Sequence, residues 1–121
     1  MEMQRALNPH LTHEVKIIDA WFGVAEALID RSPHSQAWYG FYVSFELHGR
    51  HFIHQVHAIA LGDKVTYTPL AKQQMASTAF LNIARIVYSH KLRSLTDLKG
   101  RKAVVEVFGG YTITYFKILE T

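Results

Sequence analysis

The alternation of apolar and polar residues is clearest between residues 38 and 61, which run WYGFYVSFELHGRHFIHQVHAIAL. It has a period of two on both sides of Gly49, and it therefore predicts two antiparallel strands joined by a tight turn. Glycine at the first central position favours a type II′ turn, because that position needs a positive φ. The sequence predicts this turn over residues 48–51.

The register that follows from this turn divides the side chains of the hairpin between two faces. An apolar face is predicted to pair Leu47, Phe45, Val43 and Phe41 with Phe52, His54, Val56 and Ala58. The other face pairs His48, Glu46, Ser44 and Tyr42 with His51, Ile53, Gln55 and His57. We therefore expect a core face and an open, polar and aromatic face that is available to a ligand.

The chain before and after this hairpin is predicted to be extended, with loops between the extended pieces. Residues 1–13 are expected to form a flexible N-terminal arm, and residues 14–121 a single domain. Residues 14–30 fit either helix or strand; residues 14–23 are predicted as a strand that bends at Gly23, and residues 24–30, which have helix propensity, as its continuation. Residues 31–36 are predicted as a loop, residues 62–64 as a turn and residues 65–67 as a short extended piece.

One helix is predicted, beginning with Thr68 as the N-cap and Pro69 in the first turn. Its apolar positions form one stripe: Met75, Ala76, Ala79, Phe80, Ile83, Ile86 and Val87. Residues 94–99 are expected to form a short helical turn that ends at Gly100. Strands are predicted over residues 103–108 and 111–119, on either side of a Gly-Gly pair suited to a type I′ turn.

The element order is therefore strand, strand, strand, helix, strand, strand. This order predicts a mainly β fold with one helix, namely a five-stranded OB-like barrel of order β-β-β-α-β-β. A split β-sandwich and another α+β sheet crossed by one helix have compatible patterns. Phe41, Phe45, Phe52, Phe80 and Phe116 are expected to lie in the core, by register or by stripe.

Charge is distributed unevenly along the chain. Residues 1–70 contain five Lys and Arg against seven Asp and Glu, whereas residues 71–121 contain eight against three. The second part therefore carries a formal charge of +5, which suits an anionic partner or a solvated loop. The chain has no cysteine, and it shows neither an apolar secretory segment nor a run long enough to span a membrane.

Residues 82–119 resemble the C-terminal half of small phage-encoded single-stranded-DNA-binding proteins with an OB-fold. The matching residues are Asp97, Leu98, Gly100, Arg101, Val104, Val105 and Val107. The resemblance implies single-stranded DNA binding in phage replication or recombination, in the cytoplasm of a bacterial host cell. The chain departs from many such proteins, because no acidic tail follows its last strand and its Gly-Gly connection is too short to grip DNA.

The pattern of chemically active side chains argues against an enzyme. His48, His51, His54 and His57 recur every third residue, which alternates faces on a strand and does not assemble a metal site. There is no phosphate-binding glycine loop, and the carboxylates are few. We therefore expect no metal and no cofactor. A small enzyme that uses Glu46 with a histidine remains a third hypothesis.

Single-stranded nucleic acid is the partner that the residues favour, because it needs stacking platforms beside a basic track. The predicted contacts are Trp21, Trp38, Tyr39, Tyr42, Ser44, Arg50, Gln55, His57, Lys91, Arg93, Lys99, Arg101, Lys102 and Lys117. The alternative is a protein-binding module on the same scaffold, such as a phage-encoded inhibitor of a host enzyme. Free strand edges could also pair between copies into a homo-oligomer.

Overall fold

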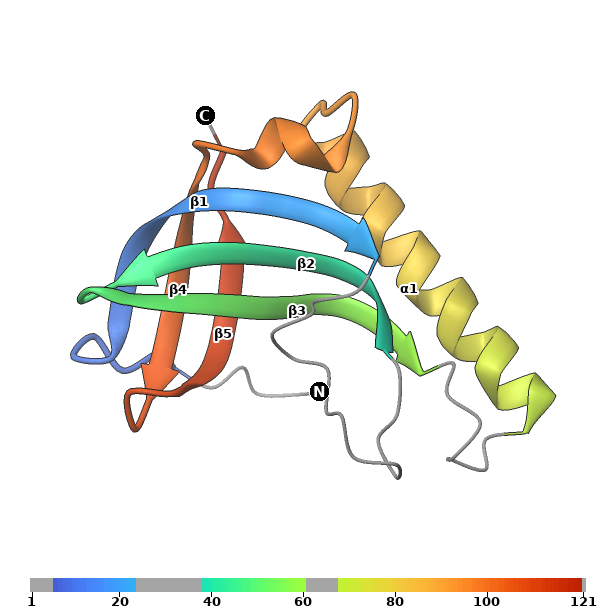
Figure 1. The fold of residues 1–121 in the computed structure, drawn as a ribbon, viewed down its shortest axis with the longest axis horizontal. Helices are drawn as coiled ribbons and strands as arrows, with labels where there is room; N and C mark the ends of the chain where they lie inside the picture. Colours follow the sequence, from blue (N-terminus) through green and yellow to red (C-terminus); the bar gives the residue numbers. More distant parts are fainter. Residues whose placement is uncertain (1–5, 24–37, 61–67, 121) are drawn as a thin grey trace.

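The computed structural model describes residues 6–23, 38–60 and 68–120 and shows a curled half-barrel of five antiparallel strands with one helix (Figure 1). The elements in chain order are β1 (Thr12–Gly23), β2 (Trp38–Leu47), β3 (Arg50–Ala60), α1 (Pro69–Ser89), the 3₁₀ helix η2 (Leu95–Leu98), β4 (Lys102–Phe108) and β5 (Thr112–Ile118). The strands lie side by side in the order β3-β2-β1-β4-β5. The predicted fold class, OB-like with the order β-β-β-α-β-β, is confirmed.

Strand β1 is shared by the two halves of the sheet. Its first residues, 12–16, pair with β4, and residues 17–23 pair with β2, with a register shift between Ile17 and Asp19. The backbone of Ile17 also bonds with the segment before β4, donating to the Arg101 carbonyl and accepting from the Gly100 amide, both at 2.8 Å. The sheet therefore curls around this point.

Strands β3 and β5 are the two edges of the sheet, and they approach each other through side chains. The Arg50 guanidinium donates to the Gly110 carbonyl at 3.0 Å, and the ring centres of His54 and Phe116 lie 4.9 Å apart. No ladder joins the two strands within the described residues. The barrel is therefore open along this seam.

The core lies inside the curl of the sheet. It is formed by Val15, Ile17, Ala20, Phe41, Val43, Phe45, Phe52, Leu98, Ala103, Val105, Val107 and Ile118. The rings of Phe45 and Phe52 stack across β2 and β3 with centres 5.3 Å apart. The core positions predicted for Phe41, Phe45 and Phe52 are confirmed, and Phe116 is half-buried at the seam.

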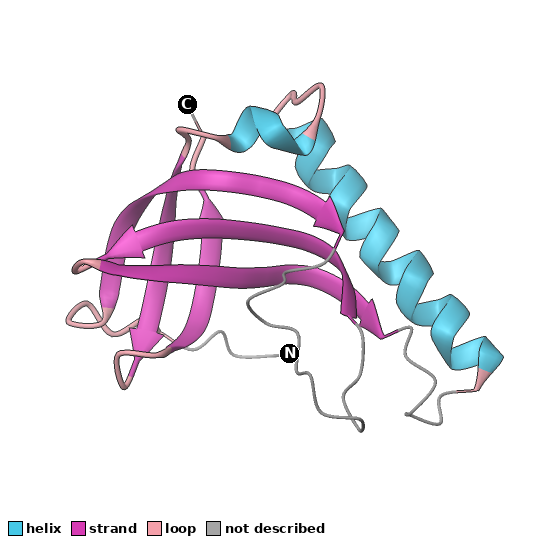
Figure 2. Cartoon of the chain, viewed as in Figure 1, coloured by secondary structure: helices cyan, strands magenta, loops and turns pink. Residues whose placement is uncertain are grey.

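Helix α1 begins as predicted but packs less tightly than its apolar stripe suggests. The Thr68 hydroxyl accepts from the Ala71 amide at 3.1 Å, and Pro69 occupies the first turn. No helix residue is fully buried. Ile83 and Ile86 pack against the core, whereas Phe80 is 75% exposed. The core position predicted for Phe80 is therefore wrong, because the helix covers only one end of the half-barrel (Figure 2).

The register predicted for the β2–β3 hairpin is shifted by two residues. Leu47 pairs with Arg50, which makes His48 and Gly49 the central residues of the turn. Their φ angles are 53° and 76°, as a type I′ turn requires. Glycine occupies the second central position rather than the first, because His48 itself adopts the left-handed conformation. The shift is even, so the side chains near the turn keep their faces.

A bulge farther along the hairpin changes the partners. Tyr42 pairs with Gln55 and Phe41 pairs with His57, with the register shift between the two pairs. His57 therefore does not pair with Tyr42, as the sequence predicted. Close to the bulge, a Cβ at Gly40 would overlap the carbonyl oxygen of His57 and the backbone of the next residue. Glycine allows the backbones of the two paired strands to approach this closely.

The predicted N-terminal arm is partly built into the sheet. Residues 12 and 13 belong to β1, and the Val107 amide donates to the Leu11 carbonyl at 3.0 Å. The buried carboxylate of Glu106 accepts from the Asn8 amide at 2.8 Å and from the Thr114 hydroxyl at 2.6 Å. The prediction of a loose arm therefore fails for residues 8–13, because this carboxylate fixes the turn that precedes β1.

Several predictions fall on parts of the chain outside the described residues. These are the arm over residues 1–5, the strand over 24–30, the loop over 31–36, the turn over 62–64 and the extended piece over 65–67. Within the described part of the chain, no helix has the length and apolar character needed to cross a membrane.

Substitution Gly40→Ala should destabilise the protein by about 3 kcal/mol, because the new methyl group meets backbone rather than a movable side chain. Urea unfolding measures the change as a lower midpoint at constant slope. Gly49→Asn is the control, since a Cβ there meets open space and asparagine tolerates positive φ. A Gly40→Ala protein as stable as the wild type would contradict the close approach of the β3 backbone to Gly40.

Candidate nucleic-acid interface

The polar face predicted for β2 is not open to solvent. Tyr42 is 2% exposed and Ser44 is 3% exposed, so side chains on both faces of this strand are buried. The Tyr42 ring stacks on Trp21 with centres 5.7 Å apart, and burial raises the pKa of the Tyr42 phenol. The prediction that Tyr42 and Ser44 lie on an open ligand surface is wrong, because the pattern cannot show that both sides of a central strand are covered.

The other residues predicted on or near this face differ in accessibility. Gln55 is exposed on β3, Trp21 and His57 are half-buried, and Tyr39 is exposed at the start of β2. Burial lowers the pKa of the His57 imidazole. Trp38 begins β2, but its side chain lies outside the described residues. Among the described side chains, His57 and Tyr39 line two different cavities.

The hairpin tips are the turns between β2 and β3 and between β4 and β5. At the other end of β4 lies the predicted basic cluster, which consists of Lys91, Arg93, Lys99, Arg101, Lys102 and Lys117. Lys91, Arg93 and Lys117 are exposed. Two other members form surface ion pairs, Lys99 with Asp19 at 3.4 Å and Lys102 with Glu14 at 3.5 Å. Exposed pairs of this kind contribute up to about 1 kcal/mol, so these lysines remain accessible to a phosphate.

Arg101 differs from the rest of the cluster because its side chain contacts Leu119, directly after β5. Its Nη2 lies 3.3 Å from Nδ1 of His90 and 3.5 Å from the Leu119 carbonyl oxygen, and its Nε is buried. Burial and the Arg101 charge lower the pKa of the His90 imidazole, against an opposing effect of Glu120. Phosphate contact by Arg101 stays a prediction, since its Nη2 already contacts His90 and Leu119.

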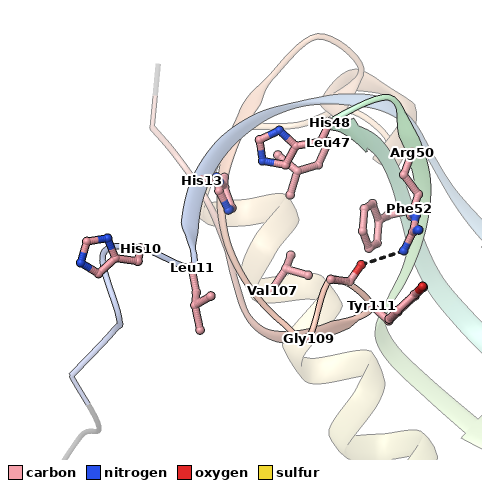
Figure 3. Close-up of a pocket in the computed structure, with 11 residues that line it drawn as sticks. His10, Leu11, His13, Leu47, His48, Arg50, Phe52, Val107, Gly109 and Tyr111 are labelled. Atoms are coloured by element: carbon pink, nitrogen blue, oxygen red, sulfur yellow. Dashed lines mark hydrogen bonds between the residues drawn. The ribbon is translucent and has the colours of Figure 1, made fainter.

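A cavity of about 470 Å³ opens where the two hairpin tips meet the start of β1 (Figure 3). We call it the barrel mouth. It is lined by His10, Leu11, His13, Leu47, His48, Arg50, Phe52, Val107, Gly109, Gly110 and Tyr111. Its volume is within the range typical of small-molecule sites, about 300–1,000 Å³. Arg50 is the one predicted contact residue that lies there.

Arg50 and Tyr111 form a fixed pair at the edge of the barrel mouth. The guanidinium carbon lies 4.3 Å from the centre of the Tyr111 ring, and one N–H donates to the Gly110 carbonyl. The Tyr111 side chain is nonetheless 73% exposed. A base can stack on the part of such a ring that still faces solvent, and a phosphate can bind the guanidinium beside it.

Histidines complete the rim. His13 and His48 meet edge to face with ring centres 5.1 Å apart, and His10 stands apart from them in the close-up (Figure 3). None of the described residues that line the barrel mouth is acidic. Among the described residues, no three His, Cys, Asp or Glu side chains are grouped so as to hold a metal ion. The chemistry of the rim therefore favours anions.

Sequence reasoning missed Tyr111, His10 and His13 as site residues. Tyr111 was expected in the last strand, but β5 begins at Thr112 and leaves Tyr111 in the loop after the two glycines. The sequence does contain a signal for an aromatic site at this turn, because Phe108 and Tyr111 flank the Gly-Gly pair. His10 and His13 belonged to the segment interpreted as an arm.

His54 lies inside the seam between β3 and β5. Burial, reinforced by the charge of His57, lowers the pKa of the His54 imidazole from 6.5 to about 4. The ring packs against Phe116, as expected for a buried neutral histidine. His54 is therefore part of the contact between the two edge strands.

Comparison with known proteins finds no matching family model, no matching curated protein and no matching solved structure.

Lowering the pH from about 6.5 to about 4 should destabilise the protein through His54. In that window the unfolded chain binds a proton on this residue and the folded chain does not, so stability is lost as pH falls, by up to about 3 kcal/mol. Urea unfolding at a series of pH values measures it. His54→Leu should flatten this dependence, whereas exposed His51→Leu should not; equal slopes in all three proteins would contradict the burial of His54.

Proposed function

We propose that the chain binds single-stranded nucleic acid without sequence preference, and that the barrel mouth is the central contact. The observation that carries the proposal is the Arg50–Tyr111 pair, a solvent-facing ring with a cation 4.3 Å from its centre, in a cavity whose described lining residues include no carboxylate. Stacking on an aromatic ring accepts any base, at about 1–3 kcal/mol per base. Sequence tolerance follows from this kind of contact.

Phosphate contacts would extend from the barrel mouth toward the basic end of β4. Strand β4 has seven residues, so its two ends lie about 20 Å apart. Exposed Lys91, Arg93 and Lys117 lie toward the end of β4 that is opposite the hairpin tips, so together with the barrel mouth they can contact a backbone several nucleotides long. Their charge supports binding that weakens with salt, because bound cations release counterions from the strand.

DNA is the expected nucleic acid, and phage replication or recombination in the cytoplasm of a bacterial host is the proposed setting. This part of the proposal depends on the resemblance of residues 82–119 to phage single-stranded-DNA-binding proteins. The OB-like half-barrel supports it, since oligonucleotide binding is a common use of this architecture. The unpaired edges of β3 and β5 leave self-association as part of the proposal.

A second candidate function, protein binding, is favoured by a separate observation. An apolar cavity of about 450 Å³ lies between α1 and the ends of β1, β2 and β3. It is lined by Phe22, Tyr39, Gly40, Ile59, Ala76, Ala79, Phe80, Ile83 and Leu95. Exposed apolar groups beside such a cavity are typical of protein interaction sites. This surface lies away from the barrel mouth, so the two functions can be tested separately.

Substitution Tyr111→Ala should weaken oligonucleotide binding about tenfold, the loss expected for one stacked base. Fluorescence anisotropy of a labelled oligo-dT measures the affinity at ~50 mM salt, and the salt dependence should have a log–log slope of about −0.7 per phosphate contact. Tyr88→Ala is the matched control, because Tyr88 is also a tyrosine, 86% exposed, but on α1.

The control variant should bind as tightly as the wild type. Equal losses in both variants would show that the barrel mouth has no special role. Absence of any anisotropy change with the wild-type protein would reject nucleic-acid binding itself and favour the protein-binding candidate.

A further inference from the structure

We propose that the barrel mouth binds the end of a strand, holding a terminal nucleotide that carries a phosphomonoester. This inference rests on the proposed function and specifies which part of the nucleic acid enters the cavity. It combines three features of the cavity: a closed apolar floor, a cationic rim and a volume of about 470 Å³.

The floor of the cavity is closed by the core. Phe52 and Val107 line it and are almost fully buried, and Phe52 stacks on Phe45 directly beneath. A strand cannot therefore pass through the half-barrel. A nucleotide from the middle of a strand would need both of its neighbours to leave by the same opening, whereas a terminal nucleotide needs one exit. The closed floor favours an end.

The floor and the rim also match the two parts of a nucleotide. Phe52, Val107 and Leu47 offer apolar surface for a base, while Tyr111 stands at the side. His13, His48 and Arg50 gather around the opening, where the sugar and phosphate would lie (Figure 3). The bond to the Gly110 carbonyl uses one of the five N–H groups of Arg50 and orients the guanidinium, leaving donors for a phosphate.

Charge distinguishes a terminal phosphate from an internal one. A phosphomonoester carries about −1.5 to −2 at pH 7, whereas each phosphodiester of the backbone carries −1. The rim offers the Arg50 charge and imidazole donors without an acidic lining residue. The second charge and the third free oxygen of a monoester therefore gain contacts here that an internal phosphate lacks.

The experiment compares four oligo-dT probes of equal length with the wild-type chain: 5′-phosphorylated, 3′-phosphorylated, linear without a terminal phosphate, and covalently closed circular. At least one phosphorylated probe should bind about tenfold more tightly than the circle, and more tightly than the unphosphorylated linear strand. Free thymidine monophosphate should compete for that probe. If inorganic phosphate competes equally well, the assignment of a nucleotide is wrong.

Substitutions in the barrel mouth test whether the preference for a phosphorylated end arises there. His13→Gln and His48→Gln should each reduce the ratio between the affinity for the phosphorylated probe and the affinity for the circle. His51→Gln is the matched control, because His51 is an exposed histidine two residues beyond Gly49 that does not line the cavity. It should keep the full preference. A preference unaffected by His13→Gln and His48→Gln would overturn the inference.

The outcomes separate this inference from the proposed function. Equal affinity of the wild-type chain for the circle and for every linear probe would overturn end binding, while binding of the circle itself would leave single-stranded nucleic-acid binding in place. Failure of all four probes to bind would reject both.

Discussion

The change of partner within β1 is the constraint on which the rest of the structure depends. One strand pairs with β4 through residues 12–16 and with β2 through residues 17–23, and the fully buried Ile17 marks the change. Backbone bonds from Ile17 to residues 100 and 101 hold the start of β4 against this point. A single strand that serves two half-sheets makes them curl around one core and not spread into a flat sheet.

This curl brings together segments that are distant in sequence. The turn before β1, the β2–β3 tip and the β4–β5 tip all reach the same end of the half-barrel, away from α1 (Figure 2). Arg50 and Tyr111 meet there although they lie about sixty residues apart in the chain, and the bond to Gly110 ties one tip to the other. The barrel mouth is thus a product of the topology, and the Arg50 contact is also part of the closure.

The sequence predicted what local patterns determine. Alternating residues, the Thr68-Pro69 helix start and the glycine turns were enough for the element order and the OB-like fold. The register near Gly49 was missed by two residues, because a histidine took a positive φ that is usual for glycine. Burial of Tyr42 on the supposedly open face was also missed, since coverage of a central strand depends on distant segments. Tyr111 entered the site only because β5 begins one residue later than the pattern indicated.

Ligand contact is proposed to be concentrated where the hairpin tips converge. Mapping of backbone amide chemical shifts by NMR during titration with a short oligo-dT tests it most directly. The largest changes should fall on residues 48–50, on residues 109–111 and on His13, with small changes along α1. Changes concentrated on the exposed apolar face of α1, with the hairpin tips unaffected, would contradict the claim.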